Sequence, residues 1–219
     1  MENSHSFFYT GSMINMNDEP KIIGFNFLQQ MDDYIKRNYK TMTCQEMYNI
    51  YKDFFNTLKD FRSNSSGFTG FPEFLVFRFV CHALGEFQPN SITDDTMEFV
   101  STTDNKLVIG QSIGMNVNGI NKKPDVLIKY DGKPISVIEI KTVTISSKTI
   151  DEVIERFNDF KDAYPKLNIL LMIFWQLTET DKGLKKLKES QNKFLILDKN
   201  DGLLFNMLNE SLKLSEIKQ

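Results

Sequence analysis

The sequence predicts a mixed α/β domain in which helices flank a central mixed sheet. Three observations lead to this fold class. Residues 124–141 contain two apolar runs on either side of Asp131-Gly132, which is the pattern of an antiparallel β-hairpin. A helical stripe and a buried apolar run follow, and strand, helix, strand in this order predicts a parallel crossover. A helix with apolar residues on most sides precedes the hairpin, as expected of a helix packed on a sheet.

The length of 219 residues and the apolar fraction of 41% are compatible with one domain and a substantial core. Within it we expect a helical N-terminal part over residues 1–62 and a core over residues 70–198. A C-terminal helix is expected over residues 199–219. The sequence contains neither a repeat nor a low-complexity segment.

Three helices are predicted before the hairpin. The first covers residues 21–39, where apolar side chains recur at helical spacing. The second begins at Thr43, which forms a capping box with Glu46 and is followed by an apolar stripe as far as Phe61. The third has Pro72 in its first turn, where proline is well tolerated. Residues 62–70 between the last two helices read as a loop.

Two strands are predicted between the third helix and the hairpin, at residues 96–101 and 106–113, from their alternation and their content of Val, Ile and Phe. Residues 116–123 are polar and contain glycine. They predict a loop that leads directly to Pro124.

Alternating elements are predicted after the hairpin. Thr149 and Glu152 form a second capping box, and the helix that follows ends at Pro165. Residues 169–175 are almost continuously apolar, as in a strand buried on both faces. We then expect a helix that starts near Thr178 and Asp181, a strand at residues 194–197 and a terminal helix at residues 203–217.

The scarcity of cysteine and histidine excludes several kinds of site. Cys44 and Cys81 are too few and too far apart for a disulfide framework or a zinc cluster. His5 and His82 do not form a pair that could bind zinc or serve a histidine-based nuclease. Any chemistry must therefore depend on carboxylates and lysines.

The formal net charge of −3 does not indicate a nucleic-acid partner, although a bulk value says little about a local groove. Lys122-Lys123 is one short basic cluster that could face phosphates. Lys185, Lys186 and Lys188 form another, for which a solvated helix surface is the competing interpretation. The first twenty residues lack a signal pattern and no apolar run is long enough to cross a membrane, so we expect a cytoplasmic protein.

Three charged residues are predicted to converge at one end of the hairpin. Ile138 and Ile140 alternate with Glu139 and Lys141, so the two charged side chains share one face of the second strand. Asp125 begins the first strand and is brought toward them by the hairpin. Two carboxylates suit Mg²⁺, which fills its other positions with water and phosphate oxygens. The alternative is a surface ion pair between Glu139 and Lys141.

The residues Pro124-Asp125 and Glu139-Ile140-Lys141 resemble the signature of the PD-(D/E)XK nuclease superfamily, which includes many type II restriction endonucleases. The resemblance covers the hairpin and, more loosely, the order of elements from about residue 70 to 175. It implies a restriction-endonuclease-like core. Asp125, Glu139 and the Ile140 carbonyl would hold Mg²⁺, and Lys141 would position the attacking water.

In this family, a helix ahead of the hairpin often contributes a further acidic residue to the metal site. Glu73 is our candidate because it lies on the apolar face of the third helix, opposite the polar strip of Arg78 and His82. Glu86 is the second candidate. The alternative for Glu73 is a first-turn glutamate that interacts with the helix dipole.

The resemblance implies a Mg²⁺-dependent endodeoxyribonuclease that leaves 5′-phosphate ends on double-stranded DNA. A compact chain of this length most resembles a type II restriction endonuclease, commonly a homodimer on a palindromic site. Loop 116–123 and Gln176 are candidate DNA contacts, although Gln176 is also explained as a polar strand end. Two other functions stay open: a structure-selective repair or recombination nuclease of the same superfamily, and a DNA-binding or assembly protein without catalysis.

Overall fold

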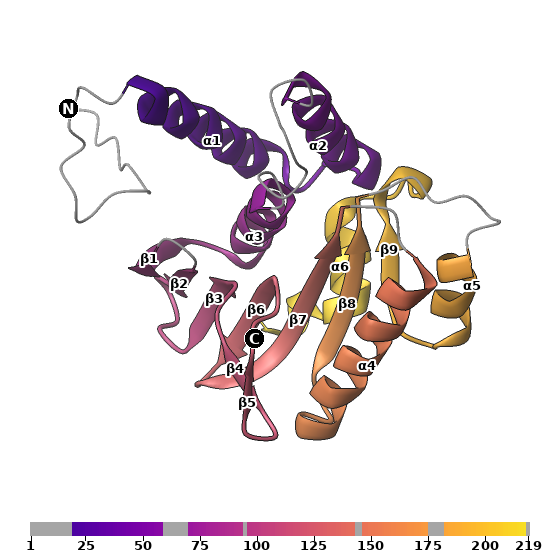
Figure 1. Ribbon diagram of the computed structural model, residues 1–219. Helices are drawn as coiled ribbons and strands as arrows, with labels where there is room; N and C mark the ends of the chain where they lie inside the picture. The colour runs from indigo at the N-terminus through magenta and orange to yellow at the C-terminus, as the bar shows by residue number, and fades with distance from the viewer. Residues whose placement is uncertain (1–18, 59–69, 94–95, 143–145, 175–181, 218–219) are drawn as a thin grey trace.

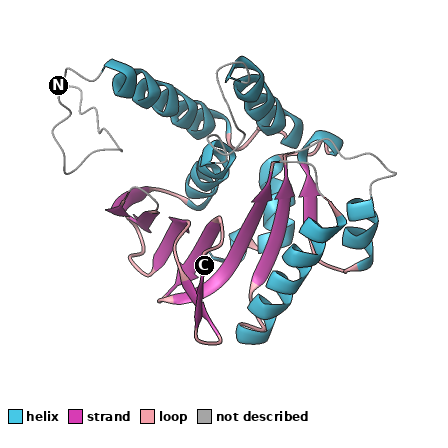
Figure 2. Ribbon diagram, in the orientation of Figure 1, coloured by secondary structure: helices cyan, strands magenta, loops and turns pink. Residues whose placement is uncertain are grey.

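The computed structural model describes residues 19–58, 70–93, 96–142, 146–174 and 182–217. It is a mixed α/β structure, in which a sheet of seven strands lies between helices (Figures 1 and 2). This confirms the predicted class of a central mixed sheet with flanking helices. Among the described residues, no helix is long and apolar enough to cross a membrane.

The strand order in the sheet is β1-β2-β3-β6-β7-β8-β9. Pairing is antiparallel from β1 to β7 and parallel from β7 through β8 to β9. The strands are β1 (Phe87–Ile92), β2 (Met97–Ser101), β3 (Leu107–Gln111), β6 (Val126–Tyr130), β7 (Lys133–Lys141), β8 (Asn168–Ile173) and β9 (Phe194–Ile196). The sheet therefore changes from antiparallel to parallel at β7, which is both the second strand of the hairpin and the first strand of the crossover.

The predicted hairpin is present as β6 and β7, with Asp131 and Gly132 at its turn. Both residues have positive φ, 50° and 74°, as a type I′ turn requires, and this explains why Asp-Gly occupies the turn. Ile138 and Ile140 pack on one face of the sheet, and Val137 packs on the other. The predicted alternation of side chains along this strand is confirmed.

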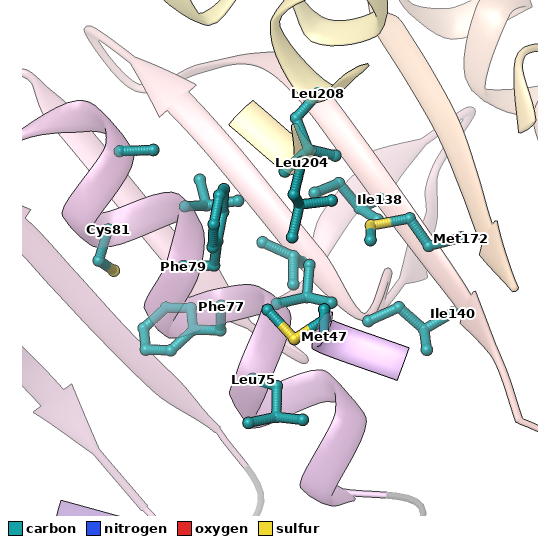
Figure 3. Close-up of a cluster of buried hydrophobic side chains, with 14 of the residues drawn as sticks. Met47, Leu75, Phe77, Phe79, Cys81, Ile138, Ile140, Met172, Leu204 and Leu208 are labelled. Atoms are coloured by element: carbon teal, nitrogen blue, oxygen red, sulfur yellow. The ribbon is translucent and has the colours of Figure 1, made fainter. Parts of the chain in front are cut away.

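The first face of the sheet carries the larger core. It is covered by helices α1 (Glu19–Asn38), α2 (Cys44–Leu58), α3 (Gly70–Leu84), α6 (Leu204–Leu212) and α7 (Leu214–Ile217). Figure 3 shows part of this core, where buried side chains of helices and strands meet: Met47, Leu75, Phe77, Phe79, Ile138, Ile140, Met172, Leu204 and Leu208. Because most of α3 is buried, its backbone position is closely fixed relative to β3 and β6.

The second face carries helices α4 (Ser147–Ala163) and α5 (Lys182–Glu189), which Figure 1 shows in front of the sheet. The apolar stripe of α4 packs on β7 and β8 through Ile150, Val153, Phe157 and Phe160. A small hairpin of β4 (Met115–Val117) and β5 (Ile120–Lys122) contributes to the same core. Helix α4 connects β7 to the parallel strand β8, so the predicted crossover is present.

Three local predictions were wrong. Residues 116–123 form much of the β4–β5 hairpin and not a loop, because Met115 and Val117 bury their side chains. Ser146 caps α4 by accepting a hydrogen bond from the Thr149 backbone nitrogen, so the helix begins three residues before the predicted capping box. The terminal helix is broken at Lys213, whose φ of 57° is left-handed, into α6 and α7.

Strand β1 was missed as well as β4 and β5, and several predictions lie outside the described residues. The sequence of β1 contains Pro89 and has a bulge next to it, which hides the alternation and suits an edge strand. Gln176, Thr178 and Asp181 are not among the residues that the structure describes.

The capping hydroxyl of Thr43 is confirmed, since it accepts a hydrogen bond from the Glu46 backbone nitrogen at 3.1 Å.

Arg78 and His82, the predicted polar strip of α3, contact one carboxylate of α1. Arg78 donates hydrogen bonds to both oxygens of Asp32, at 2.5 and 2.7 Å, and His82 Nε2 lies 2.8 Å from Asp32 Oδ1. The side chains of Asp32 and Arg78 are almost fully buried. This buried contact, which we call the α1–α3 ion pair, fixes the first helix against the third.

Candidate functional site

Asp125 lies where β6 begins beside the end of β7. Regular pairing of these strands ends at Val126 and Ile138. Beyond it, Asp125 Oδ2 accepts a hydrogen bond from the Ile140 backbone nitrogen at 2.6 Å. The carboxylate thus takes the place of the next backbone partner, and its position is set by the hairpin register.

Glu139 lies on the α4 face of β7 and is only 1% exposed. Its Oε1 atom is 3.2 Å from Nη2 of Arg156 on α4, and its Oε2 atom is 4.0 Å from Nζ of Lys141. The Arg156 contact is not a directed hydrogen bond, because the buried Oε1 atom has no hydrogen-bond partner among the described residues. Glu139 is therefore a buried carboxylate balanced by nearby charge, which excludes the alternative of a wet surface ion pair.

Glu73 lies in the first turn of α3 and approaches the same end of the sheet from the opposite helical layer. Its Oε2 atom accepts a hydrogen bond from Gln111 Nε2 at 3.3 Å. Gln111 ends β3 and is the register partner of Val126, the residue after Asp125. Glu86, the second candidate, is exposed beyond the other end of α3. The structure therefore brings Glu73 near Asp125 and Glu139, whereas Glu86 lies about three and a half helical turns further along the chain, past the end of α3.

The three carboxyl groups influence each other's ionisation. Burial and the negative charges of Asp125 and Glu73 together raise the pKa of Glu139 to about 7, although Arg156 and Lys141 oppose the rise. Burial and the charge of Asp125 also raise the pKa of Glu73 to about 7. Burial raises the pKa of Asp125, against the hydrogen bond from Ile140 and the charges of Lys141 and Arg156. Clusters of acids with raised pKa values are typical of functional sites.

The donor set fits a hard divalent cation better than it fits any other resident group. Mg²⁺ binds carboxylate oxygens and commonly uses one or two of them, with water and phosphate oxygens as its other ligands. Asp125 and Glu139 provide such a pair, and a cation would also satisfy Glu139 Oε1. Within the described ranges, no three His, Cys, Asp or Glu side chains are already grouped closely enough to hold a metal ion together. The site therefore presents a carboxylate pair, with Glu73 as an acid nearby.

Arg156 and Gln111 belong to the site, and the sequence did not single them out. Arg156 lies between Val153 and Phe157, two residues of the buried stripe of α4. A cation bordered by apolar residues, on the helix that follows the second hairpin strand, was the available sequence signal for it. Gln111 had no such signal. Its importance depends on the β3–β6 register, which no local pattern specifies.

A cleft of about 490 Å³ adjoins the site between β5 and α4. It is lined by Lys122, Lys123, Glu152, Glu155, Arg156 and Asp159. Lys122 forms an ion pair with Asp159, so only part of the predicted basic cluster is free to face a phosphate. Lys186, of the second predicted cluster, forms an ion pair with Asp151 at 2.6 Å. The balance of charges in the cleft does not by itself favour a polyanion.

Comparisons with protein-family models, curated proteins and solved structures found no match to this chain.

Proposed function

We propose that this protein is a Mg²⁺-dependent endodeoxyribonuclease with a restriction-endonuclease-like core. One observation carries the proposal: at the end of β7, the half-buried carboxylate of Asp125 and the buried carboxylate of Glu139 lie near the ammonium of Lys141, which is 4.0 Å from Glu139 Oε2. Strands β7 and β8 are parallel, so their carboxyl ends share an edge of the sheet, and ligand sites in such sheets lie beyond that edge. The residues of the Pro-Asp and Glu-Ile-Lys motif thus occupy one place in space.

The order of elements supports the same core. If β1, β2 and the β4–β5 hairpin are taken as additions, helix α3 is followed by antiparallel β3, β6 and β7, then by helix α4 and the parallel strand β8. This agrees with the α-β-β-β-α-β arrangement that the resembled superfamily uses. This correspondence is an analogy of fold, and because one fold can carry many functions, the site residues and not the topology support the proposed function.

The proposed cation ligands are Asp125, Glu139 and the Ile140 carbonyl, with Glu73 as a third acidic group that binds or orients an ion. When bound, Mg²⁺ supplies a Lewis acid and lowers the pKa of water. Asp125 is held for this role by the Ile140 N–H, which orients its carboxylate. Burial keeps water away from Glu139 and strengthens its electrostatic interactions.

Lys141 is the proposed catalytic cation. Its ammonium lies at the mouth of the site with part of its side chain exposed, whereas Glu139 beside it is buried. From this position it orients the attacking water and stabilises the negative charge that develops on the phosphate in the transition state. The bond broken is a phosphodiester bond of DNA, and the 5′-phosphate ends follow from the resemblance. We further propose a type II restriction endonuclease that acts as a homodimer in the cytoplasm.

The test is cleavage of supercoiled plasmid by the purified chain with Mg²⁺, compared with Asp125→Asn, Glu139→Gln, Lys141→Ala and Glu73→Gln. We expect the first two substitutions to lower cleavage at least about 100-fold, because each removes a cation ligand without opening a cavity. Lys141→Ala is expected to lower turnover nearly as much and to preserve Ca²⁺ binding in calorimetry. Glu73→Gln is expected to lower the rate less than either ligand substitution.

The matched control is Lys148→Ala, which removes an exposed cation of α4 whose partner is Glu152. Discrete bands from the wild-type chain would support a restriction endonuclease, and cleavage restricted to junctions or flaps would support a repair nuclease. No cleavage with Mg²⁺, Mn²⁺ or Ca²⁺ would contradict the nuclease proposal and favour a DNA-binding protein. Cleavage by Glu139→Gln at the rate of the control would show that Glu139 is not a cation ligand needed for cleavage.

A further inference from the structure

We propose that Arg156 is a positioning residue that supplies the counter-charge of Glu139 until a divalent cation replaces it. The inference rests on the proposed cation site and not on nuclease activity. Arg156 comes from α4 and reaches across to the sheet, where its Nη2 atom lies 3.2 Å from a Glu139 oxygen and Lys141 Nζ lies 4.0 Å from the other.

Three contacts hold the guanidinium in place. Its Nη2 atom lies 3.2 Å from Glu139 Oε1 and also donates a hydrogen bond to the Lys123 carbonyl oxygen. The guanidinium carbon lies 5.5 Å from the centre of the Phe160 ring, within the range of a cation–π contact. Arg156 thereby links the carboxylate on β7 to the segment between β5 and Asp125.

The contact with Glu139 has the character of an exchangeable ion pair. Although the charged atoms are 3.2 Å apart, Glu139 Oε1 has no hydrogen-bond partner, and Arg156 Nε is likewise buried without one among the described residues. An ion pair that lacks directed hydrogen bonds pays much of the cost of burial without the full gain. A divalent cation with twice the charge is therefore expected to compete successfully for this carboxylate.

The position of Arg156 allows it to give up the carboxylate. About a third of its side chain is exposed, and it lines the 490 Å³ cleft between β5 and α4. The guanidinium can lose Glu139 and keep its contacts with Lys123 and Phe160. In the cation-free protein it limits the repulsion among Glu73, Asp125 and Glu139, and in the cation-bound protein this task passes to the ion.

The test measures Ca²⁺ binding by calorimetry at pH 8.0 in the absence of DNA. Arg156→Gln removes the competing charge and is expected to bind Ca²⁺ at least about fivefold more tightly than the wild type, a typical size for coupling between two ligands of one site. Arg156→Lys retains a positive charge and is expected to bind with an affinity between the two. Lys122→Ala, a cation of the same cleft that pairs with Asp159, is the control and should bind as the wild type does.

Thermal unfolding in EDTA gives a second readout through a double-mutant cycle. Arg156→Gln is expected to lower the melting temperature in the wild-type background and to have little effect in the Glu139→Gln background, because Arg156 acts through that carboxylate. Should Arg156→Gln fail to fold alone, folding of the double variant supports the proposal, and failure of both contradicts it.

Three results would overturn the inference. They are unchanged or weaker Ca²⁺ affinity in Arg156→Gln, an equal loss of stability in both backgrounds, and absence of Ca²⁺ binding by the wild type. Cation binding with the expected response to Arg156→Gln, but without DNA cleavage, would instead retain this inference and contradict only the proposed nuclease.

Discussion

At the scale of single residues, the site is a set of acids held in a place that opposes their ionisation. Glu139 is buried beside Asp125, whose negative charge adds to the effect of burial and raises the pKa of Glu139, and burial also raises the pKa of Asp125. Repulsion among these carboxylates lowers the stability of the cation-free protein, and a bound cation would remove that repulsion. The same residues therefore predict both a function and a pH dependence.

The cation-free protein is expected to lose stability as the pH rises from about 5 to 8. The ordinary pKa of a glutamate is 4.5, and the pKa of Glu139 in the folded protein is about 7. Between these values the folded state binds more protons than the unfolded state, so the free energy of unfolding falls as pH rises. Mg²⁺ should reduce the fall, because it binds the ionised carboxylates.

Melting temperatures measured from pH 5 to 8, in EDTA and in Mg²⁺, check this expectation. Glu139→Gln cannot ionise at this position, so its EDTA profile should fall less steeply than that of the wild type. The same slope in both proteins would show that Glu139 ionises in the fold as it does in the unfolded chain.

Sequence reasoning identified Asp125, Glu139, Lys141 and Glu73 because chain-local features place them: a hairpin turn, strand alternation and a helical face. Their assembly in one place is what the structure adds. Arg156 had only a weak signal of this kind and Gln111 had none, since each reaches the site through contacts with distant parts of the chain. The charge balance of the cleft likewise depends on the pairing of Lys122 with Asp159, which lie on different elements.

At the scale of elements, the long helices and the central strands were predicted because their apolar residues recur with a clear period. The strands β1, β4 and β5 lack a clear period and were missed. β1 is an edge strand with a proline and a bulge, and β4 and β5 have three residues each. Short strands offer too few positions for alternation to be recognised. The elements that position the site, α3, β6, β7 and α4, are those whose patterns extend over more residues or end in a recognisable turn.

The α1–α3 ion pair predicts the consequence of a change far from the site. Asp32→Asn removes the charge of the carboxylate that Arg78 contacts on α1, and we expect a loss of roughly 3 kcal/mol in the free energy of unfolding. Although burial opposes it, hydrogen bonds from His82 and Arg78 hold the pKa of Asp32 below its usual value. This contribution is therefore present at neutral pH and is lost as pH falls through the lowered pKa.

Urea unfolding at pH 7.5 measures the loss, with Asp33→Asn on the same helix as the control. Calcium affinity should not change in Asp32→Asn at a temperature where the variant is folded, because Asp32 contacts none of the site residues. An Asp32→Asn protein as stable as the control would show that the α1–α3 ion pair contributes nothing to the fold.

At the scale of the whole molecule, the proposed function depends on a sheet that changes from antiparallel to parallel at β7. The antiparallel side brings Asp125 to the end of β7, and the parallel side brings α4 and Arg156 over it. Helix α3 adds Glu73 from the opposite layer. The site is therefore a product of the complete three-layer arrangement, and no single element contains it.

The central claim is that Asp125 and Glu139 hold a divalent cation, and the most direct test is a crystal of the chain grown with Mn²⁺. We predict an anomalous scattering peak within about 2.5 Å of both carboxylates, with Arg156 displaced from Glu139. The peak should be absent from crystals of Glu139→Gln grown in the same solution. A wild-type crystal at saturating Mn²⁺ with no peak at these carboxylates, and with the Arg156–Glu139 contact intact, would contradict the account.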